Sequence, residues 1–188
     1  LLWYFDKILS LGLPHPSNIV FLYFIGFFIL LMVLKVDPWL AIAGAIAFAL
    51  SSYFFIIIDV GHNSKAHAIA YIAPVLAGII LTLRRKYILG GILTAIFLSL
   101  EIKANHPQIT YYLVLMVMLL GLFELIFAIR QKRVARLFLS ISVLVIAAAF
   151  AVLTNIATLW ATWEYGKDTI RGKSELTNDL DNKTTGLD

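Results

Sequence analysis

Residues 59–67 read Asp59-Val60-Gly61-His62-Asn63-Ser64-Lys65-Ala66-His67, a mostly polar stretch between two long apolar runs. The run before it, residues 39–58, would be about 30 Å long as a helix. The run after it, residues 66–83, is also apolar and contains Pro74. Helices of this length and composition cross a lipid bilayer. The stretch is therefore predicted to be a polar turn at a membrane surface.

The composition is that of an integral membrane protein. Of the 188 residues, 61% are hydrophobic and 14% are charged, whereas soluble domains have about 45–50% and about 25%. The sequence has no cysteine, which excludes disulfides and thiolate metal sites. The net charge is +4, but the basic residues cluster in short loops between apolar runs. We therefore expect membrane lipids as partners and no nucleic acid.

Six apolar segments separated by short polar loops predict an all-α, polytopic transmembrane helical bundle. The expected spans are residues 19–34, 38–58, 66–83, 88–104, 109–129 and 137–163. Residues 1–16 are amphipathic and too short to span, so they predict an interfacial helix. Pro74 frees the carbonyl of Ala70 and predicts a kink beside a neighbouring helix or a cavity. The bundle would occupy residues 17–163, and residues 164–188 would form a polar tail.

Charge is distributed unequally between the two sides of this predicted bundle. Eight basic residues fall in alternate loops: Lys35, Arg84, Arg85, Lys86, Arg130, Lys132, Arg133 and Arg136. The positive-inside rule makes that side cytoplasmic. The other side receives the stretch 59–67, a second polar stretch at 101–108, the tail and all four histidines. We expect a multi-pass protein of the bacterial inner membrane whose polar site and tail face outward.

The two outer polar stretches suggest two kinds of ligand. Imidazole and carboxylate groups suit a divalent metal ion such as Mn²⁺ or Zn²⁺, although His62 and His67 are five residues apart rather than the four of a helical metal pair. Lys65 and Lys103, near a helix N-terminus, suit a phosphate; snorkelling to lipid headgroups is the simpler alternative. Lys103 and Glu101 form the stronger functional pair, because ionisable groups at membrane depth normally face a cavity or a partner.

Three motifs follow one another along the chain. They are Gly61-His62-Asn63-Ser64-Lys65 with Ala68-Ile69-Ala70-Tyr71, then Asn105-His106-Pro107-Gln108-Ile109-Thr110-Tyr111-Tyr112, then Glu164-Tyr165-Gly166 with Arg171-Gly172-Lys173-Ser174-Glu175-Leu176-Thr177. Together they resemble the bacterial YfhO family of multi-spanning membrane proteins, which is similar to GT-C glycosyltransferases. The resemblance implies a GT-C-like fold. It also implies that this chain is an internal part of a longer protein and contacts the remainder of it.

The resemblance further implies transfer of a sugar from a polyprenyl-phosphate donor to an extracytoplasmic acceptor. The main catalytic acid would lie in an outward loop that precedes this section, with Asp59 and Glu101 as supporting acids. The residues expected to bind substrate are His62, Asn63, Lys65, His67, Tyr71, Lys103, Asn105, His106, Gln108, Tyr111 and Arg171. Among them Lys65, Lys103 and Arg171 would neutralise the carrier phosphate as it leaves.

Two other functions fit the same pattern. A transporter or lipid translocase would use broken helices and charges within the membrane as a pathway. A non-catalytic scaffold subunit would instead present the two polar stretches to other membrane subunits. These alternatives stay open at the level of the sequence.

Overall fold

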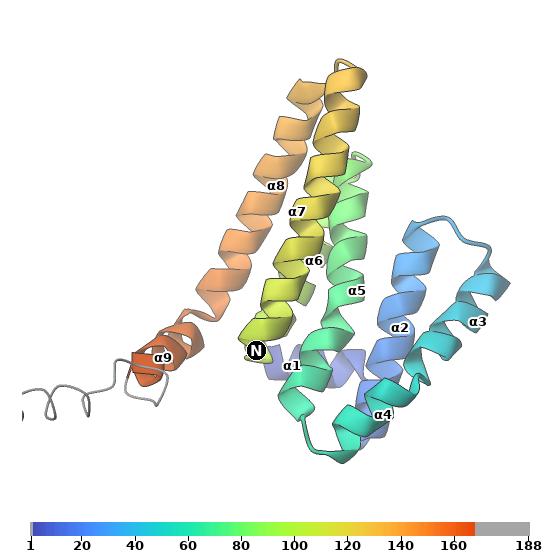
Figure 1. Ribbon diagram of the computed structural model, residues 1–188, viewed down its shortest axis with the longest axis vertical. Helices are drawn as coiled ribbons and strands as arrows, with labels where there is room; N and C mark the ends of the chain where they lie inside the picture. The colour runs from blue at the N-terminus through green and yellow to red at the C-terminus, as the bar shows by residue number, and fades with distance from the viewer. Residues whose placement is uncertain (1, 168–188) are drawn as a thin grey trace, which may run out of the picture. The chain divides into compact units, whose positions relative to one another are not determined.

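A computed structural model describes residues 2–167, and these residues form nine helices and no strand (Figure 1). The helices are α1 (Leu2–Leu9), α2 (Ser17–Val33), α3 (Pro38–Ala49), α4 (Ser52–Asp59), α5 (Asn63–Leu83), α6 (Tyr87–Lys103), α7 (Pro107–Arg130), α8 (Val134–Thr154) and α9 (Ile156–Lys167). The described residues divide into two units at Asn155, residues 2–155 and residues 156–167. Each unit is described by itself.

Four helical segments among the described residues are long and apolar enough to cross a membrane. They are Pro38–Asp59, Asn63–Leu83, Pro107–Arg130 and Val134–Thr154. The helix Ser17–Val33 is also apolar but shorter, at 17 residues. The prediction of an all-helical membrane protein is therefore confirmed.

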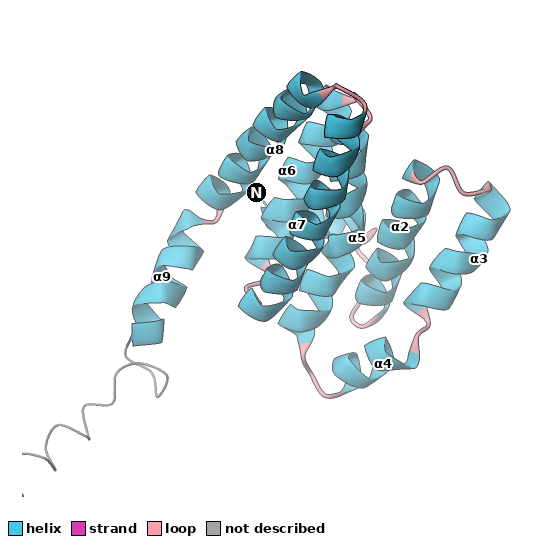
Figure 2. Ribbon diagram, turned by 45° about the horizontal axis from the view of Figure 1, so that its top comes forward, coloured by secondary structure: helices cyan, strands magenta, loops and turns pink. Residues whose placement is uncertain are grey.

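Helix α5 is the centre of the first unit. It packs against α2 on one side and α6 on the other, and it also contacts α4, α7 and α8. Because α3 packs on α2, and α8 on α6, the helices form a row in the order α3, α2, α5, α6, α8 (Figures 1 and 2). Helix α7 lies against α5, α6 and α8. Short loops join the successive helices, as Figure 2 shows.

Two glycines allow α5 and α6 to approach each other closely. A Cβ atom at Gly78 would lie 2.6 Å from Thr94 Oγ1, and one at Gly90 would lie 2.3 Å from Thr82 Oγ1. Each threonine hydroxyl donates to a carbonyl of its own helix, Thr82 to Gly78 O at 3.0 Å and Thr94 to Gly90 O at 2.8 Å. Small residues at such positions let helix backbones pack in a lipid environment. This reciprocal contact makes α5 and α6 the tightest pair of the bundle.

The proline of α5 faces a neighbouring helix, one of the two surroundings that the sequence predicts. Pro74 has no N–H to offer the carbonyl of Ala70. Helix α2 packs at that carbonyl, since a Cβ atom at Gly26 would lie 2.9 Å from Ala70 O. One turn earlier the buried Tyr23 hydroxyl donates to Ala66 O at 3.0 Å. Helix α2 therefore covers the Ala70 carbonyl, which lacks its helical hydrogen bond.

The predicted span over residues 38–58 corresponds to the apolar segment Pro38–Asp59, but this segment is built from two helices rather than one. Helix α3 ends at Ala49, and Ser51 is extended, with φ −60° and ψ 133°, before α4 begins. Serine pairs are common at helix kinks, because serine competes with the helical hydrogen bonds. The break allows Phe54 to stack on Tyr23, with ring centroids 4.1 Å apart. This aromatic packing offsets the interrupted hydrogen bonds.

The predicted last span, residues 137–163, is also divided. Helix α8 ends at Thr154, and Asn155 separates it from α9. The buried Asn155 amide donates from Nδ2 to Ser99 O and Ala151 O, both at 2.9 Å. A buried amide in an apolar segment needs hydrogen-bond partners, because leaving it without them is costly. The bonds of Asn155 to backbone carbonyls occur where α8 ends, as is common for asparagine.

The second unit is described as far as Lys167, where α9 ends. The rings of Trp160 and Trp163 lie with centroids 5.5 Å apart on this helix. The tail predicted from residue 164 therefore begins inside α9. Residues 168–188, the rest of that tail, lie outside the described residues.

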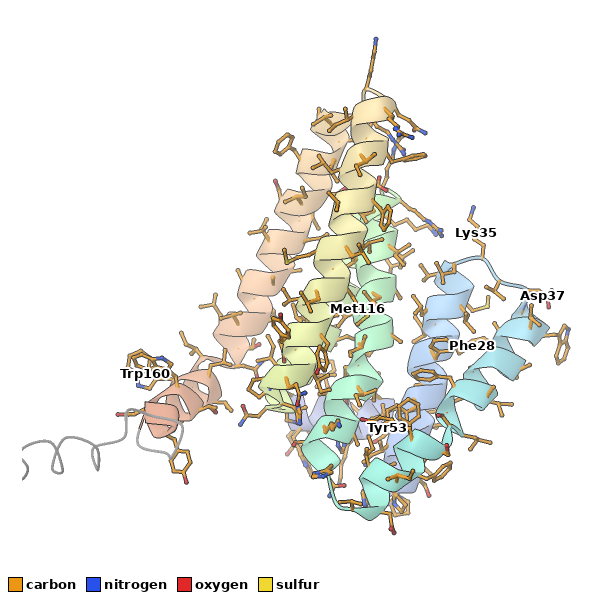
Figure 3. The ribbon with its side chains drawn as sticks, viewed as in Figure 1. Phe28, Lys35, Asp37, Tyr53, Met116 and Trp160 are labelled. Carbon is orange, nitrogen blue, oxygen red and sulfur yellow. The ribbon has the colours of Figure 1, made fainter. Side chains whose placement is uncertain are left out.

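The first unit has a polar end and a basic end (Figure 1). The basic end carries the α2–α3, α5–α6 and α7–α8 loops, and Figure 3 labels Lys35 and Asp37 there. The polar end carries the α4–α5 and α6–α7 loops, so both polar stretches meet at one end as predicted. Helix α1 lies across the polar end and packs on α6. It is shorter than the predicted interfacial segment, because Leu11 and Gly12 have positive φ values.

Candidate functional site

A cavity of about 200 Å³ opens at the polar end between α1, α5 and α6. We call it the polar cavity. Its lining residues are Asp6, Asn63, Ser64, His67, Tyr71, Leu100, Lys103 and Ala104. Four of these, Asn63, His67, Tyr71 and Lys103, are among the predicted substrate-binding residues. The fold thus brings part of both polar stretches together with α1.

The α5 side of the polar cavity is built from the first two turns of the helix. Asn63, His67 and Tyr71 are spaced by four residues, which places them on one face of a helix. No side chain caps the N-terminus of α5, so its first N–H groups keep the partial positive charge of a helix start. The helix therefore presents hydrogen-bond donors at the polar end.

His67 is held in a defined orientation by its own helix. Its Nδ1 atom lies 3.0 Å from Asn63 O. A carbonyl oxygen can only accept, so Nδ1 carries the proton and donates. The Nε2 atom then remains for a ligand, as an acceptor when the ring is neutral and as a donor when it is protonated.

Asp6 joins α1 to the wall of the polar cavity. The hydroxyl of Tyr71 donates to Asp6 Oδ1, and Tyr71 is only 2% exposed. This contact ties the N-terminal helix to the central helix. Asp6 is the only carboxylate among the lining residues, and the sequence did not single it out.

Lys103 brings a positive charge to the α6 side of the polar cavity. It is the last residue of α6 and is half-buried. Leu100 and Ala104 lie beside it in the lining and add apolar surface. The cavity therefore combines one ammonium, one carboxylate and one imidazole with an uncapped helix start. Such a set of groups can bind the phosphate of a ligand that also has an apolar part.

Lys65 does not line the polar cavity, although the sequence groups it with Lys103. Its Nζ atom lies over the ring of Tyr53, 5.4 Å from the centroid. The side chain is therefore directed to α4. Asp59 and His62 are exposed at the end of α4 and in the following loop. These three residues are near the site in sequence but outside the lining.

Glu101 is completely buried, at 0% exposure, and does not line the polar cavity. Its Oε1 atom accepts a hydrogen bond of 3.0 Å from the Thr110 hydroxyl of α7. Residues two apart lie on nearly opposite faces of a helix, so Glu101 contacts α7 while Lys103 lines the cavity. Glu101 and Lys103, which the sequence groups together, therefore lie in different surroundings.

The other predicted residues belong to the start of α7. Asn105 has a left-handed φ of 53° in the turn before the helix. His106 precedes α7 and its Nδ1 atom is buried without a partner in the described part of the chain. Gln108 donates to the Tyr112 hydroxyl at 2.8 Å, and Tyr111 is 58% exposed. None of these residues lines the polar cavity.

Two further predictions stay predictions. Arg171 lies outside the described residues. Within residues 2–167, no group of three or more His, Asp or Glu side chains is placed to hold a metal ion. The divalent metal stays a prediction.

Sequence reasoning missed Asp6, Ser64, Leu100 and Ala104 among the lining residues. Asp6 is the single acidic residue in the amphipathic segment of residues 1–16. A lone acid in such a segment was the feature that could have indicated a role for it. The last two are apolar or small residues on a helix full of such residues, so nothing distinguished them.

Known proteins offer no match to this chain. No family model, no curated protein and no solved structure is similar to it. The function is therefore argued from the polar cavity itself.

Proposed function

We propose that this chain is a section of a membrane glycosyltransferase that uses a polyprenyl-phosphate sugar donor, and that the polar cavity holds the carrier phosphate. The observation that carries the proposal is the convergence of Lys103, His67 and the uncapped start of α5 on one cavity. The ammonium of Lys103 and the uncapped helix start favour a negatively charged ligand, and His67 adds a donor to it when its ring is protonated. Phosphate attached to a lipid would reach such a site at the edge of the bilayer.

The proposed topology has six spans in a GT-C-like arrangement. Helices α2 and α6 have 17 residues each, which gives about 25 Å against a hydrocarbon core of about 30 Å. Local thinning of the bilayer can accommodate a difference of this size. The positive-inside rule then places the basic end in the cytoplasm and the polar cavity on the outer face of the bacterial inner membrane.

The proposed chemistry is displacement at the anomeric carbon of the sugar. The acceptor hydroxyl forms a bond to that carbon, the bond from carbon to the phosphate oxygen breaks, and the carrier phosphate leaves with the electron pair. Lys103 and His67 would stabilise the charge that develops on the phosphate. Asp6 would take the acceptor proton, whereas the sequence had named Asp59 and Glu101 as supporting acids.

The two lysines of the polar end provide the test. The complete protein in nanodiscs is titrated with polyprenyl phosphate, and binding is measured by native mass spectrometry. Lys103→Ala should weaken binding about tenfold or more, because hydrogen bonds to charged groups contribute about 1.5–3 kcal/mol. Lys65→Ala removes the same charge at the same end but should leave binding within about twofold.

Equal binding by Lys103→Ala and the unmodified protein would contradict the assignment of the phosphate site. If Lys103→Ala and Lys65→Ala lose the same affinity, binding depends on the total charge of the polar end and not on the polar cavity. A transfer assay on Asp6→Asn then tests the catalytic part separately, with loss of transfer and retained carrier binding as the expected result.

A further inference from the structure

A second polar cavity lies at the basic end, between the α5–α6 loop and the α7–α8 hairpin. We call it the basic cavity. Its lining residues are Leu83, Arg85, Tyr87, Glu124, Ala128, Arg133, Arg136, Leu137 and Ser140. Its volume is about 20 Å³, which is room for one group the size of a water molecule. Figure 3 shows side-chain nitrogens gathered at this end of the bundle.

The lining of the basic cavity has an excess of positive charge. Arg85, Arg133 and Arg136 face one carboxylate, that of Glu124. Arginine is always protonated in proteins, so three fixed positive charges surround a very small volume. A single glutamate leaves the lining with a net positive charge; Arg133 is half-buried, whereas Arg85 and Arg136 are exposed.

Arg133 is the best-positioned donor of the three. Its Cζ atom lies 4.7 Å from the centroid of the Phe127 ring, and its backbone N–H donates to Ala128 O at 2.9 Å. Its Nε atom is buried and has no hydrogen-bond partner in the part of the chain that the structure describes. A buried donor without an acceptor is costly, and more so when it is charged. The side chain is therefore fixed in place with a donor that needs an oxygen.

Of the polar groups that line the cavity, the Ser140 hydroxyl already has hydrogen-bond partners. The hydroxyl of Ser140 lies within hydrogen-bond distance of Thr82 O at 3.4 Å and Arg136 O at 3.2 Å. Both of those acceptors are backbone carbonyls, so Ser140 acts as a donor in these contacts. An external oxygen can accept from the unpartnered Nε–H of Arg133.

We propose that the basic cavity binds a phosphate group, with one phosphate oxygen inside the cavity and the rest at its mouth. The forked N–H groups of arginine match phosphate oxygens and give strong charge-assisted bonds. The cavity lies at the ends of three helices long and apolar enough to span the membrane, α5, α7 and α8, where the phosphates of lipid headgroups also lie. The source is therefore either an anionic lipid or free inorganic phosphate. This site is independent of the polar cavity and of its proposed function.

The lipid arm of the test uses the complete protein in nanodiscs of phosphatidylcholine with added phosphatidylglycerol. Native mass spectrometry counts the phosphatidylglycerol molecules that stay bound. The double variant Arg133→Gln with Arg136→Gln should bind about tenfold more weakly or worse. The matched control, Arg130→Gln with Lys132→Gln, removes two charges from the same hairpin outside the lining and should stay within about twofold.

The second arm replaces phosphatidylglycerol with inorganic phosphate in nanodiscs of phosphatidylcholine alone. Binding that needs phosphatidylglycerol identifies a lipid headgroup, and binding of inorganic phosphate identifies a free anion; either supports the proposal. Glu124→Gln removes the opposing charge and should strengthen binding about threefold or more, which a merely unfolded variant cannot do. Absence of both ligands from the unmodified protein, equal loss in the two double variants, or no gain in Glu124→Gln would overturn it.

Discussion

Helices α5 and α7 show how differently two helices of spanning length can be used in one protein. They have 21 and 24 residues, and both are long and apolar enough to cross a membrane. Yet 67% of the apolar window of α5 is buried, against 11% for α7, although α7 is the more apolar of the two. Hydropathy therefore identifies helices that enter the membrane and does not identify which helix forms the core.

The difference follows from side-chain size. Buried positions of α5 include Ala66, Ala70, Ala77 and Gly78, and these let α2 and α6 approach its backbone. Helix α7 exposes large side chains such as Met118 and Phe123 instead. Lipid tails are as apolar as leucine, so close packing rather than hydrophobicity distinguishes an interior helix from a lipid-facing one.

The largest expected effect tests the close approach itself. Gly78→Ala would place a Cβ atom 2.7 Å from the Thr94 backbone nitrogen, so α5 and α6 must separate. We expect a loss of about 3 kcal/mol of stability, at the upper end for overpacking, measured by unfolding in mixed detergent micelles. In α7, Gly121→Ala adds the same methyl group where no atom lies within 4 Å, and it should be neutral or slightly stabilising. Equal effects would refute the contrast between the helices.

A smaller effect is expected for a buried hydroxyl. Tyr71→Phe removes the donor to Asp6 and leaves the carboxylate in a half-buried position, at a cost of about 2 kcal/mol. Tyr112→Phe in α7 removes an exposed bond to Gln108, and surface changes of this kind are usually within about 0.5 kcal/mol. The same unfolding measurement compares the two, and hydrogen exchange should show α1 loosened only by Tyr71→Phe. Unchanged exchange in α1 would show that Asp6 does not anchor this helix.

A comparable effect is expected for the polar contact that holds α7 to α6. Thr110→Val removes the hydroxyl that donates to Glu101, and we expect a cost of about 2 kcal/mol, because the carboxyl group is completely buried and loses this hydrogen bond. Hydrogen exchange should rise at the start of α7 and stay unchanged in α5. Thr110→Ser keeps the hydroxyl and serves as the control. If both variants behave alike, packing of the methyl group rather than the hydrogen bond holds α7.

The predicted helix limits agree with the structure where charged or proline residues mark them. The segments 66–83, 88–104 and 109–129 correspond to Asn63–Leu83, Tyr87–Lys103 and Pro107–Arg130. The breaks at Ser51 and Asn155 were missed. Both lie inside apolar runs, and both involve contacts with distant residues, Phe54 on Tyr23 and Asn155 with Ser99. The pattern of apolar and polar residues along a segment does not show which distant residues will pack against it.

The residues of the candidate site also fall into those that the sequence predicts and those that only the structure assigns. Four lining residues of the polar cavity were predicted because polar residues at the start of an apolar helix are conspicuous. Lys65 and Lys103 were indistinguishable as members of one predicted cluster. The structure separates them, because one side chain lies over Tyr53 and the other lines the cavity. Side-chain direction depends on the helix face, and the face that is covered depends on the neighbours.

The sequence by itself determined that this protein is helical and built for a membrane, where its main turns lie, and that polar and basic residues gather at opposite ends. These properties follow from composition and from the length of apolar runs, which act locally. Only the tertiary structure decided that α5 is the core, that Asp6 joins Tyr71, and that three arginines surround one small cavity. Each of these depends on residues far apart in the chain, which are brought together by the close packing that small side chains allow.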